Sequence, residues 1–318
     1  MEDSLTKYFV IAAISVFSLR LYFHIRGLFR PLKLKDKHVL ITGGSSGLGK
    51  EIAKECYYRG AYVTVLAKSR SSLLATMKEL EIHNENSGLG NFLQVFDCNL
   101  ATSEGIEAVV DRAERRFGPV FLFIGCSGTA KGGFFLDTAP QTFKEQMKSN
   151  FFSTVNSLQP VAKRMTKRQV GHVCLVGSYQ SYTPVPGMCA WSASKCAVES
   201  LAKSIRPELE RFNVKVYLFS PGPMETPGYY QAKVNKTDLV DQLEGRPIKP
   251  EVACSILLNG IAAGDRNITT HDFLSFIRVS SLGGVSRNNL LLDAIFGVFS
   301  VVAGHFYSLY IDFRVRFT

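Results

Sequence analysis

The sequence predicts an α/β fold with a doubly wound parallel sheet over residues 36–270. Two observations carry this prediction. Short apolar runs alternate with helical segments, and a glycine-rich turn separates the first apolar run from the first helix. Parallel strands joined through helices are covered on both faces, so they read as continuous apolar runs. On either side, residues 1–30 are predicted to form a membrane anchor and residues 280–318 a membrane-associated tail.

The composition is that of a folded protein with additional apolar material. The chain has 318 residues, of which 46% are hydrophobic and 20% charged, and its formal net charge is +10. No basic cluster is interleaved with aromatic residues, so we expect no nucleic-acid partner, whereas a basic excess suits an anionic membrane surface. The seven cysteines include no CxxC pair, which predicts reduced thiols facing the cytosol and no metal site.

An apolar stretch at residues 8–25 has about the minimum length for crossing a hydrocarbon core. A signal peptide and a buried helix of the domain are the alternatives. Acidic residues at the N-terminus and large residues after the stretch favour a retained anchor over a signal peptide. Positive charge follows the stretch, which places the body of the protein in the cytosol. The basic residues are Arg26, Arg30, Lys33, Lys35 and Lys37.

The first predicted strand, residues 38–42, leads into a glycine-rich turn and a helix at 50–59. Such a turn lets a phosphate approach backbone N–H groups at a helix N-terminus, which is typical of the Rossmann fold. The candidate cofactor-binding residues of the turn are Gly43, Ser45, Ser46, Gly47 and Gly49.

The second strand, residues 61–67, ends where a dinucleotide-binding fold reads the ribose. An acid there would bind the 2′-hydroxyl of NAD, but this chain has Lys68, Ser69 and Arg70. Cations suit a 2′-phosphate, so we expect NADPH as the cofactor. The alternative is that Lys68 and Arg70 only begin a solvated helix.

The centre of the chain continues the alternation. Strand 92–98 contains Asp97 near its end, helix 103–117 follows, and strand 120–126 comes next. A long helix is predicted over 140–165, and it carries Asn150.

The segment from residue 171 to residue 195 joins three features that point to chemistry. A buried strand at 172–177 ends at Ser178, and a loop rich in proline, which cannot be helix, follows it. From residue 190 the pattern is helical. Trp191 and Lys195 are four residues apart, so they share one face of this helix.

The last part of the domain adds strand 214–220, a Pro221-Gly222 turn, an irregular polar region at 229–248 and a helix at 250–263. A second apolar segment covers residues 289–313 and is interrupted by Asp293. It is compatible with a second span, a re-entrant hairpin or an interfacial helix.

These motifs resemble the short-chain dehydrogenase/reductase family. TGGSSGLG is similar to its TGxxxGxG signature, and the spacing from Ser178 to SASK matches its Ser and YxxxK pattern. The resemblance implies that Ser178 binds the substrate oxygen and that Lys195 binds the nicotinamide ribose. It also implies that Asn150 holds a water of the proton relay and that Asp97 contacts adenine.

Trp191 departs from the family pattern, which has a proton-donating Tyr at this place. An indole N–H is a hydrogen-bond donor that does not titrate in the useful range. By its place in the motif, Trp191 belongs to the catalytic set, and either another group donates the proton or the reaction is slow. Tyr179 and Tyr182 lie nearby on the loop as alternative donors.

A narrower resemblance is to the branch of this family that reduces 3-ketodihydrosphingosine. The shared features are an anchor, a basic linker, GGSSGLG, a cation after the second strand, ETPGY and an apolar tail. The resemblance implies NADPH-dependent reduction of a long-chain lipid ketone at the cytosolic face of the endoplasmic reticulum membrane, with a possible homo-oligomer. The alternatives are a reductase of another lipid and an NADP-binding relative without activity.

Overall fold

The computed structural model describes residues 32–87, 92–233 and 244–271. The predicted anchor at 1–30 and the predicted tail at 280–318 lie outside these residues. Within the described ranges, no helix has both the length and the apolar character to cross a membrane.

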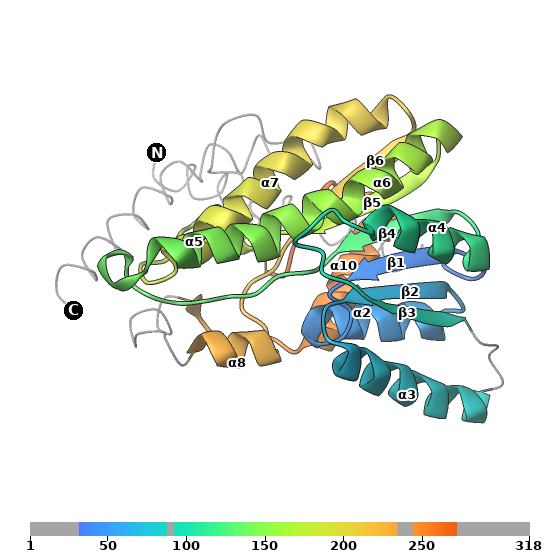
Figure 1. Ribbon diagram of the computed structural model, residues 1–318, viewed down its shortest axis with the longest axis horizontal. Coiled ribbons are helices and arrows are strands. Elements are labelled where there is room, and N and C mark those ends of the chain that lie inside the picture. Colours follow the sequence, from blue (N-terminus) through green and yellow to red (C-terminus); the bar gives the residue numbers. More distant parts are fainter. Residues whose placement is uncertain (1–31, 88–91, 234–243, 272–318) are drawn as a thin grey trace, which may run out of the picture.

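A single parallel sheet of seven strands forms the centre of the described fold (Figure 1), in the order β3-β2-β1-β4-β5-β6-β7. The order reverses direction between β1 and β4, as expected of a doubly wound sheet. The α/β prediction is confirmed. The strands are β1 (His38–Thr42), β2 (Tyr62–Ala67), β3 (Leu93–Asp97), β4 (Val120–Gly125), β5 (Gly171–Val176), β6 (Val214–Ser220) and β7 (Asn267–Thr269).

Helices cover both faces of the sheet (Figure 1). Alternate residues of one strand serve different faces, as a pleated strand requires: Val39 and Ile41 pack with helices α2, α3 and α10, while Leu40 packs with α4, α6 and α7. The helices are α2 (Gly47–Tyr58), α3 (Arg70–Ser87), α4 (Ile106–Phe117), α5 (Pro140–Gln146), α6 (Ser153–Arg168), α7 (Cys189–Glu210), α8 (Pro227–Lys233) and α10 (Pro250–Ala263).

Three segments differ from their predicted form. The predicted helix 140–165 is divided by a π-helix, Met147–Phe152, into α5 and α6. The loop after Ser178 was expected to contain no helix, but it begins with a 3₁₀ turn, Tyr179–Ser181. This turn ends before Pro184, the first proline of the loop. Helix α8 occupies the start of the region predicted as irregular.

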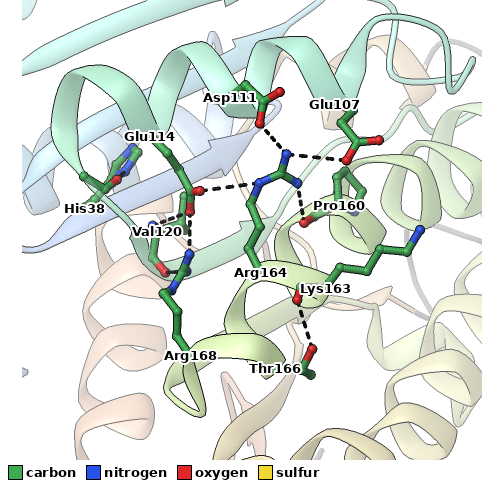
Figure 2. A network of polar contacts seen from close by, with 11 residues as sticks. His38, Glu107, Asp111, Glu114, Val120, Pro160, Lys163, Arg164, Thr166 and Arg168 are labelled. Atoms are coloured by element: carbon green, nitrogen blue, oxygen red, sulfur yellow. Dashed lines mark hydrogen bonds and ion pairs between the residues drawn. The ribbon is translucent and has the colours of Figure 1, made fainter.

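Ion pairs hold α6 against α4 on the outside of the sheet (Figure 2). Arg164 contacts Asp111 and lies 3.5 Å from a carboxylate oxygen of Glu114. Glu114 also accepts from Arg168 at 3.1 Å and from the N–H of Val120 at 2.9 Å. The network therefore ties two helices to the first residue of β4.

Candidate active site

A cavity of about 640 Å³ lies at the carboxyl ends of the strands. In a doubly wound sheet this edge is where ligands bind, next to the reversal in strand order. Residues at or just after the ends of six strands contribute to its wall, namely residues 43, 45–49, 67–69, 98–101, 126–130, 176–180 and 221–224.

The glycine-rich turn after β1 forms one end of this cavity, and its close packing leaves no room for a Cβ at two of its glycines. Gly43 has φ +70°, and a Cβ added there would lie 2.8 Å from the Cα of Ser127. A Cβ on Gly49 would lie 2.4 Å from the carbonyl oxygen of Gly43. The backbone therefore faces the cavity directly, and the N-terminus of α2 begins at Gly47 beside Ser46. This arrangement fits the phosphates of a dinucleotide.

Only one of the two cations expected to read the ribose faces the cavity. Lys68 is exposed and lines it, whereas Arg70 begins α3 and is not among the lining residues. Ser69 between them accepts the N–H of Ser72 at 3.3 Å, which caps this helix.

Asp97 ends β3 with an exposed side chain and is not among the lining residues either. The next four residues, 98–101, form the wall in its place. The predicted contact of Asp97 with adenine therefore stays a prediction.

Ser178 and Lys195 both line this cavity, as the spacing predicts. Ser178 follows β5, is 4% exposed, and its Oγ accepts the N–H of Gln180 at 3.2 Å. Lys195 Nζ donates to the carbonyl of Val176 at 2.9 Å. Both side chains line the cavity together with Trp191.

The Lys195 ammonium lies 4.8 Å from the centroid of the Trp191 ring. Burial lowers the pKa of Lys195 to about 8, because removal from water disfavours the charged amine. The electron-rich face of the indole acts in the opposite direction and favours the ammonium. The shared helix face predicted for these two residues is therefore confirmed by their contact.

Asn150 is fully buried in the π-helix, behind the cavity wall. Its Oδ1 accepts from the N–H of Thr129 at 2.8 Å, and its Nδ2 donates to Ser194 Oγ at 2.8 Å. A Cβ added to Gly128 would lie 2.6 Å from Asn150 Oδ1 and 3.7 Å from Lys195 Nζ. Asn150 thus braces the loop after β4 against α7, next to Lys195.

The two tyrosines considered as alternative donors lie in different places. Tyr179 is buried, lines the cavity and packs in one cluster with Met188 and Trp191. The hydroxyl of Tyr182 is 3.2 Å from Ser220 Oγ, and Tyr182 is not among the lining residues. Of the two, only Tyr179 lines the cavity, and its hydroxyl is buried.

Among the lining residues that were not predicted from the sequence, Gln180 and Glu244 are bonded to each other. Gln180 is 2% exposed and donates through Nε2 to Glu244 Oε1 at 2.6 Å, while its Oε1 accepts from Ser192 at 3.0 Å. Gln180 lies two residues after Ser178, and this proximity to a predicted site residue is the sequence signal that could have identified it as a lining residue. Glu244 lies in the region predicted as irregular, and no sequence signal distinguishes it.

Comparison with known proteins gives the same fold and one recurrent activity. A family model described as short chain dehydrogenase matches residues 37–237. The chain is 31% identical to a 3-dehydrosphinganine reductase of Danio rerio, over 80% of this chain and 78% of the relative. It is 34% identical to a 3-ketodihydrosphingosine reductase of Bos taurus, over 75% and 72% of the two chains.

Solved structures extend the comparison. A variant of actinorhodin polyketide ketoreductase with NADPH has 25% identity and a TM-score of 0.66, covering 75% of this chain and 97% of its own. A short chain dehydrogenase/reductase from Burkholderia phymatum in complex with NAD has 19% identity and a TM-score of 0.69, covering 81% and 100%. The second likeness concerns the fold alone.

Proposed function

Because this chain belongs to the short-chain dehydrogenase family, we propose that it reduces 3-ketodihydrosphingosine to dihydrosphingosine with NADPH. One observation carries the proposal: Ser178 and Lys195 line the same cavity as the glycine-rich turn and Lys68. The relatives named as reductases of this lipid ketone support the choice of substrate.

The cofactor would lie along the turn after β1, with Lys68 beside its 2′-phosphate. Bound NADPH supplies the hydride that reaches the ketone carbon. Ser178 donates its hydroxyl hydrogen bond to the ketone oxygen, and the Lys195 ammonium stabilises the negative charge that develops there.

Lys195 is the group that we expect to supply the proton. Trp191 contributes a ring that does not titrate, and Lys195 touches that ring from within the cavity. A proton leaves the ammonium for the alkoxide oxygen, the lysine becomes a neutral amine, and solvent then returns the proton. Its lowered pKa of about 8 makes the ammonium a better acid than an ordinary lysine.

The substitution Trp191→Tyr tests how much the missing hydroxyl matters. Purified full-length protein is assayed with NADPH and 3-ketodihydrosphingosine. We expect slow turnover by the wild type and an increase in kcat of about a hundred-fold or more in Trp191→Tyr, since a positioned acid contributes about that factor. The wild-type kcat falls as pH rises above about 8, because Lys195 then loses its proton.

Tyr179→Phe is the matched control, because Tyr179 also lines the cavity and this change removes only a hydroxyl. The wild-type rate should be unaffected by it. A fast wild type that Trp191→Tyr leaves unchanged would show that position 191 is not where an acid is missing. Loss of the wild-type rate in Tyr179→Phe would assign the proton to Tyr179.

A second candidate function is cofactor binding without turnover. The observation that favours it is Trp191 itself, which keeps Lys195 covered by a ring and brings no acid. This candidate predicts that NADPH binds to the wild type, that no product forms, and that Trp191→Tyr restores turnover. A reductase of another lipid ketone would instead leave 3-ketodihydrosphingosine unreduced in both variants.

We place the protein at the endoplasmic reticulum membrane with its catalytic domain in the cytosol. The apolar segments 8–25 and 289–313 and the basic residues after the first of them support this placement. A glycosylation tag added at the N-terminus should become glycosylated in microsomes, and an unmodified tag would contradict the orientation. Homo-oligomer formation stays a prediction, which the mass of the detergent-solubilised full chain would test.

A further inference from the structure

We propose that Glu244, held by Gln180, forms a subsite for the ammonium group of an α-amino ketone. The inference rests on the proposed function and deepens it, since it assigns the residue that selects the substrate by its amine. A carbonyl-binding Ser and a Lys would serve any ketone, whereas 3-ketodihydrosphingosine carries an amino group on the carbon next to its ketone.

The position of Glu244 carries the inference. It is a carboxylate in the wall of the cavity that also contains Ser178. The 3₁₀ turn Tyr179–Ser181 joins the two, because the N–H of Gln180 bonds to Ser178 Oγ while its side chain bonds to Glu244. If the ketone oxygen of the substrate binds at Ser178, the amine-bearing carbon next to the ketone therefore lies toward the part of the wall that contains Glu244.

Hydrogen bonds fix the direction in which Gln180 presents its amide. Ser192 Oγ donates to the amide oxygen at 3.0 Å, so the amide NH₂ is turned toward Glu244, 2.6 Å away. Gln180 and Ser192 are both buried, at 2% and 3% exposure, and a buried side chain bonded in this way is held in one rotamer. A carboxylate accepts several hydrogen bonds, so Glu244 can keep that of Gln180 and accept others from an ammonium.

Electrostatics give a reason for a carboxylate at this place. Lys195 and Lys68 both line the cavity, and a second ammonium brought in by a substrate would be repelled by Lys195. A fixed negative charge near the ketone site offsets this repulsion. Glu145, also in the wall, is exposed and its Oε1 accepts from Gln141 at 3.3 Å, so it lacks a buried support.

The competing explanation is that Glu244 only anchors the chain that returns to the 3₁₀ turn. An anchor would matter for stability and would not distinguish ligands with and without an amine. The two explanations therefore differ in selectivity, which a pair of ligands can measure.

The test compares a short-chain 2-amino-3-ketone with the same ketone lacking the amino group. Trp191, the one tryptophan of the chain, lies in the cavity and reports binding through its fluorescence, in the presence of NADP⁺. We expect the wild type to prefer the aminoketone, and Glu244→Gln to weaken aminoketone binding about 10- to 100-fold. Binding of the ketone without the amine should stay unchanged, and Glu145→Gln should resemble the wild type.

Glu244→Gln keeps a group that accepts from Gln180, so the turn should keep its form, and unchanged binding of the neutral ketone verifies this. Equal losses for both ligands would make Glu244 an anchor and overturn the inference. So would loss of selectivity in Glu145→Gln alone. If the wild type reduces the aminoketone and Glu244→Gln keeps its selectivity, the inference fails while the proposed function stands. If the wild type prefers the ketone without an amine, the proposed substrate fails as well.

Discussion

If Trp191 stands at the place of the family's tyrosine, as we propose, the exchange of a phenol for an indole changes one property of the site and keeps another. Trp191 retains a ring on the face of α7 that Lys195 shares, and the two are in contact at 4.8 Å. What is lost is a hydroxyl that can give up a proton. Since Lys195 is 4% exposed and its amine is the titrating group beside that ring, we expect proton transfer at this position to depend on the lysine.

The structure separates the two cations that were expected to select NADPH. Lys68→Ala should weaken NADPH binding about ten-fold, because a charge-assisted contact to the 2′-phosphate is lost, and leave NADH binding nearly unchanged. Energy transfer from Trp191 to the reduced nicotinamide measures both affinities. Arg70→Ala removes a cation that does not line the cavity and serves as the control. A ten-fold loss in Arg70→Ala, or an equal loss for NADPH and NADH in Lys68→Ala, would refute this assignment.

Motif spacing predicted that Ser178 and Lys195 belong to one site, and both line the same cavity, because both lie within one strand-loop-helix segment. Asp97 was not brought to the cavity wall, and Glu244 was not foreseen. The bond between Gln180 and Glu244 joins residues 64 positions apart, so it depends on how the chain returns over the sheet. Local sequence patterns carry no information on such a return.

Among the elements, the π-helix shows where periodicity alone is insufficient. The segment 140–168 has a helical pattern throughout, and hydrophobic spacing does not distinguish one wider turn from a regular one. Hydroxyl groups follow the wide turn and bond back to the carbonyl four residues earlier: Ser153 to Ser149, Thr154 to Asn150, and Ser157 to Ser153. These bonds stabilise the backbone around Asn150, which the turn directs into the protein.

The edge strand β7 is held by a buried arginine of α7. Arg206 is 1% exposed, and it donates to the carbonyls of Val216 and Arg266 at 3.0 and 2.8 Å and to Asn267 Oδ1 at 3.2 Å. Arg206→Met should lower the free energy of unfolding by about 2 to 4 kcal/mol, since buried acceptors lose a charged donor. Urea unfolding gives this value, and amide exchange at β7 should accelerate most.

Arg211→Met is the matched control for Arg206→Met. Arg211 ends the same helix, is exposed, and lies 4.8 Å from the ring of Phe212. Its replacement should change the free energy of unfolding by about 0.5 kcal/mol or less. Equal effects of the two substitutions, or unchanged exchange at β7 in Arg206→Met, would mean that the arginine does not hold this strand.

For the molecule as a whole, the sequence predicted the central strands of the sheet but did not predict the edge strand β7. Six of the strands are apolar runs of five residues or more, and each was expected within one residue of its observed ends. The seventh, Asn267–Thr269, has three residues, two of them polar, so it pairs with β6 without a pattern of its own. The parallel order follows from the helices between strands, because each crossover returns the chain to the same edge.

Stability should fall in acid because the folded protein keeps a histidine neutral. His172 lies in β5 against the rings of Phe121 and Tyr217, and its Nδ1 is 3.1 Å from the Tyr217 hydroxyl. Burial, with a smaller contribution from the charge of Lys215, lowers the pKa of His172 to about 4. In the unfolded chain this imidazole has its ordinary pKa near 6.5.

Between about pH 6.5 and pH 4 the unfolded chain therefore binds a proton that the folded chain does not, and the free energy of unfolding decreases as pH falls. The slope is about 1.4 kcal/mol per pH unit, so the loss reaches about 3 kcal/mol by pH 4.

His172→Phe keeps an aromatic ring between Phe121 and Tyr217 and should flatten this part of the stability curve, measured by urea unfolding at each pH. His271→Gln changes an exposed histidine and should leave the curve as it is. A curve equally steep in His172→Phe and in the wild type would place the acid sensitivity in other groups, of which His38, whose pKa is also lowered by burial, is the first to examine.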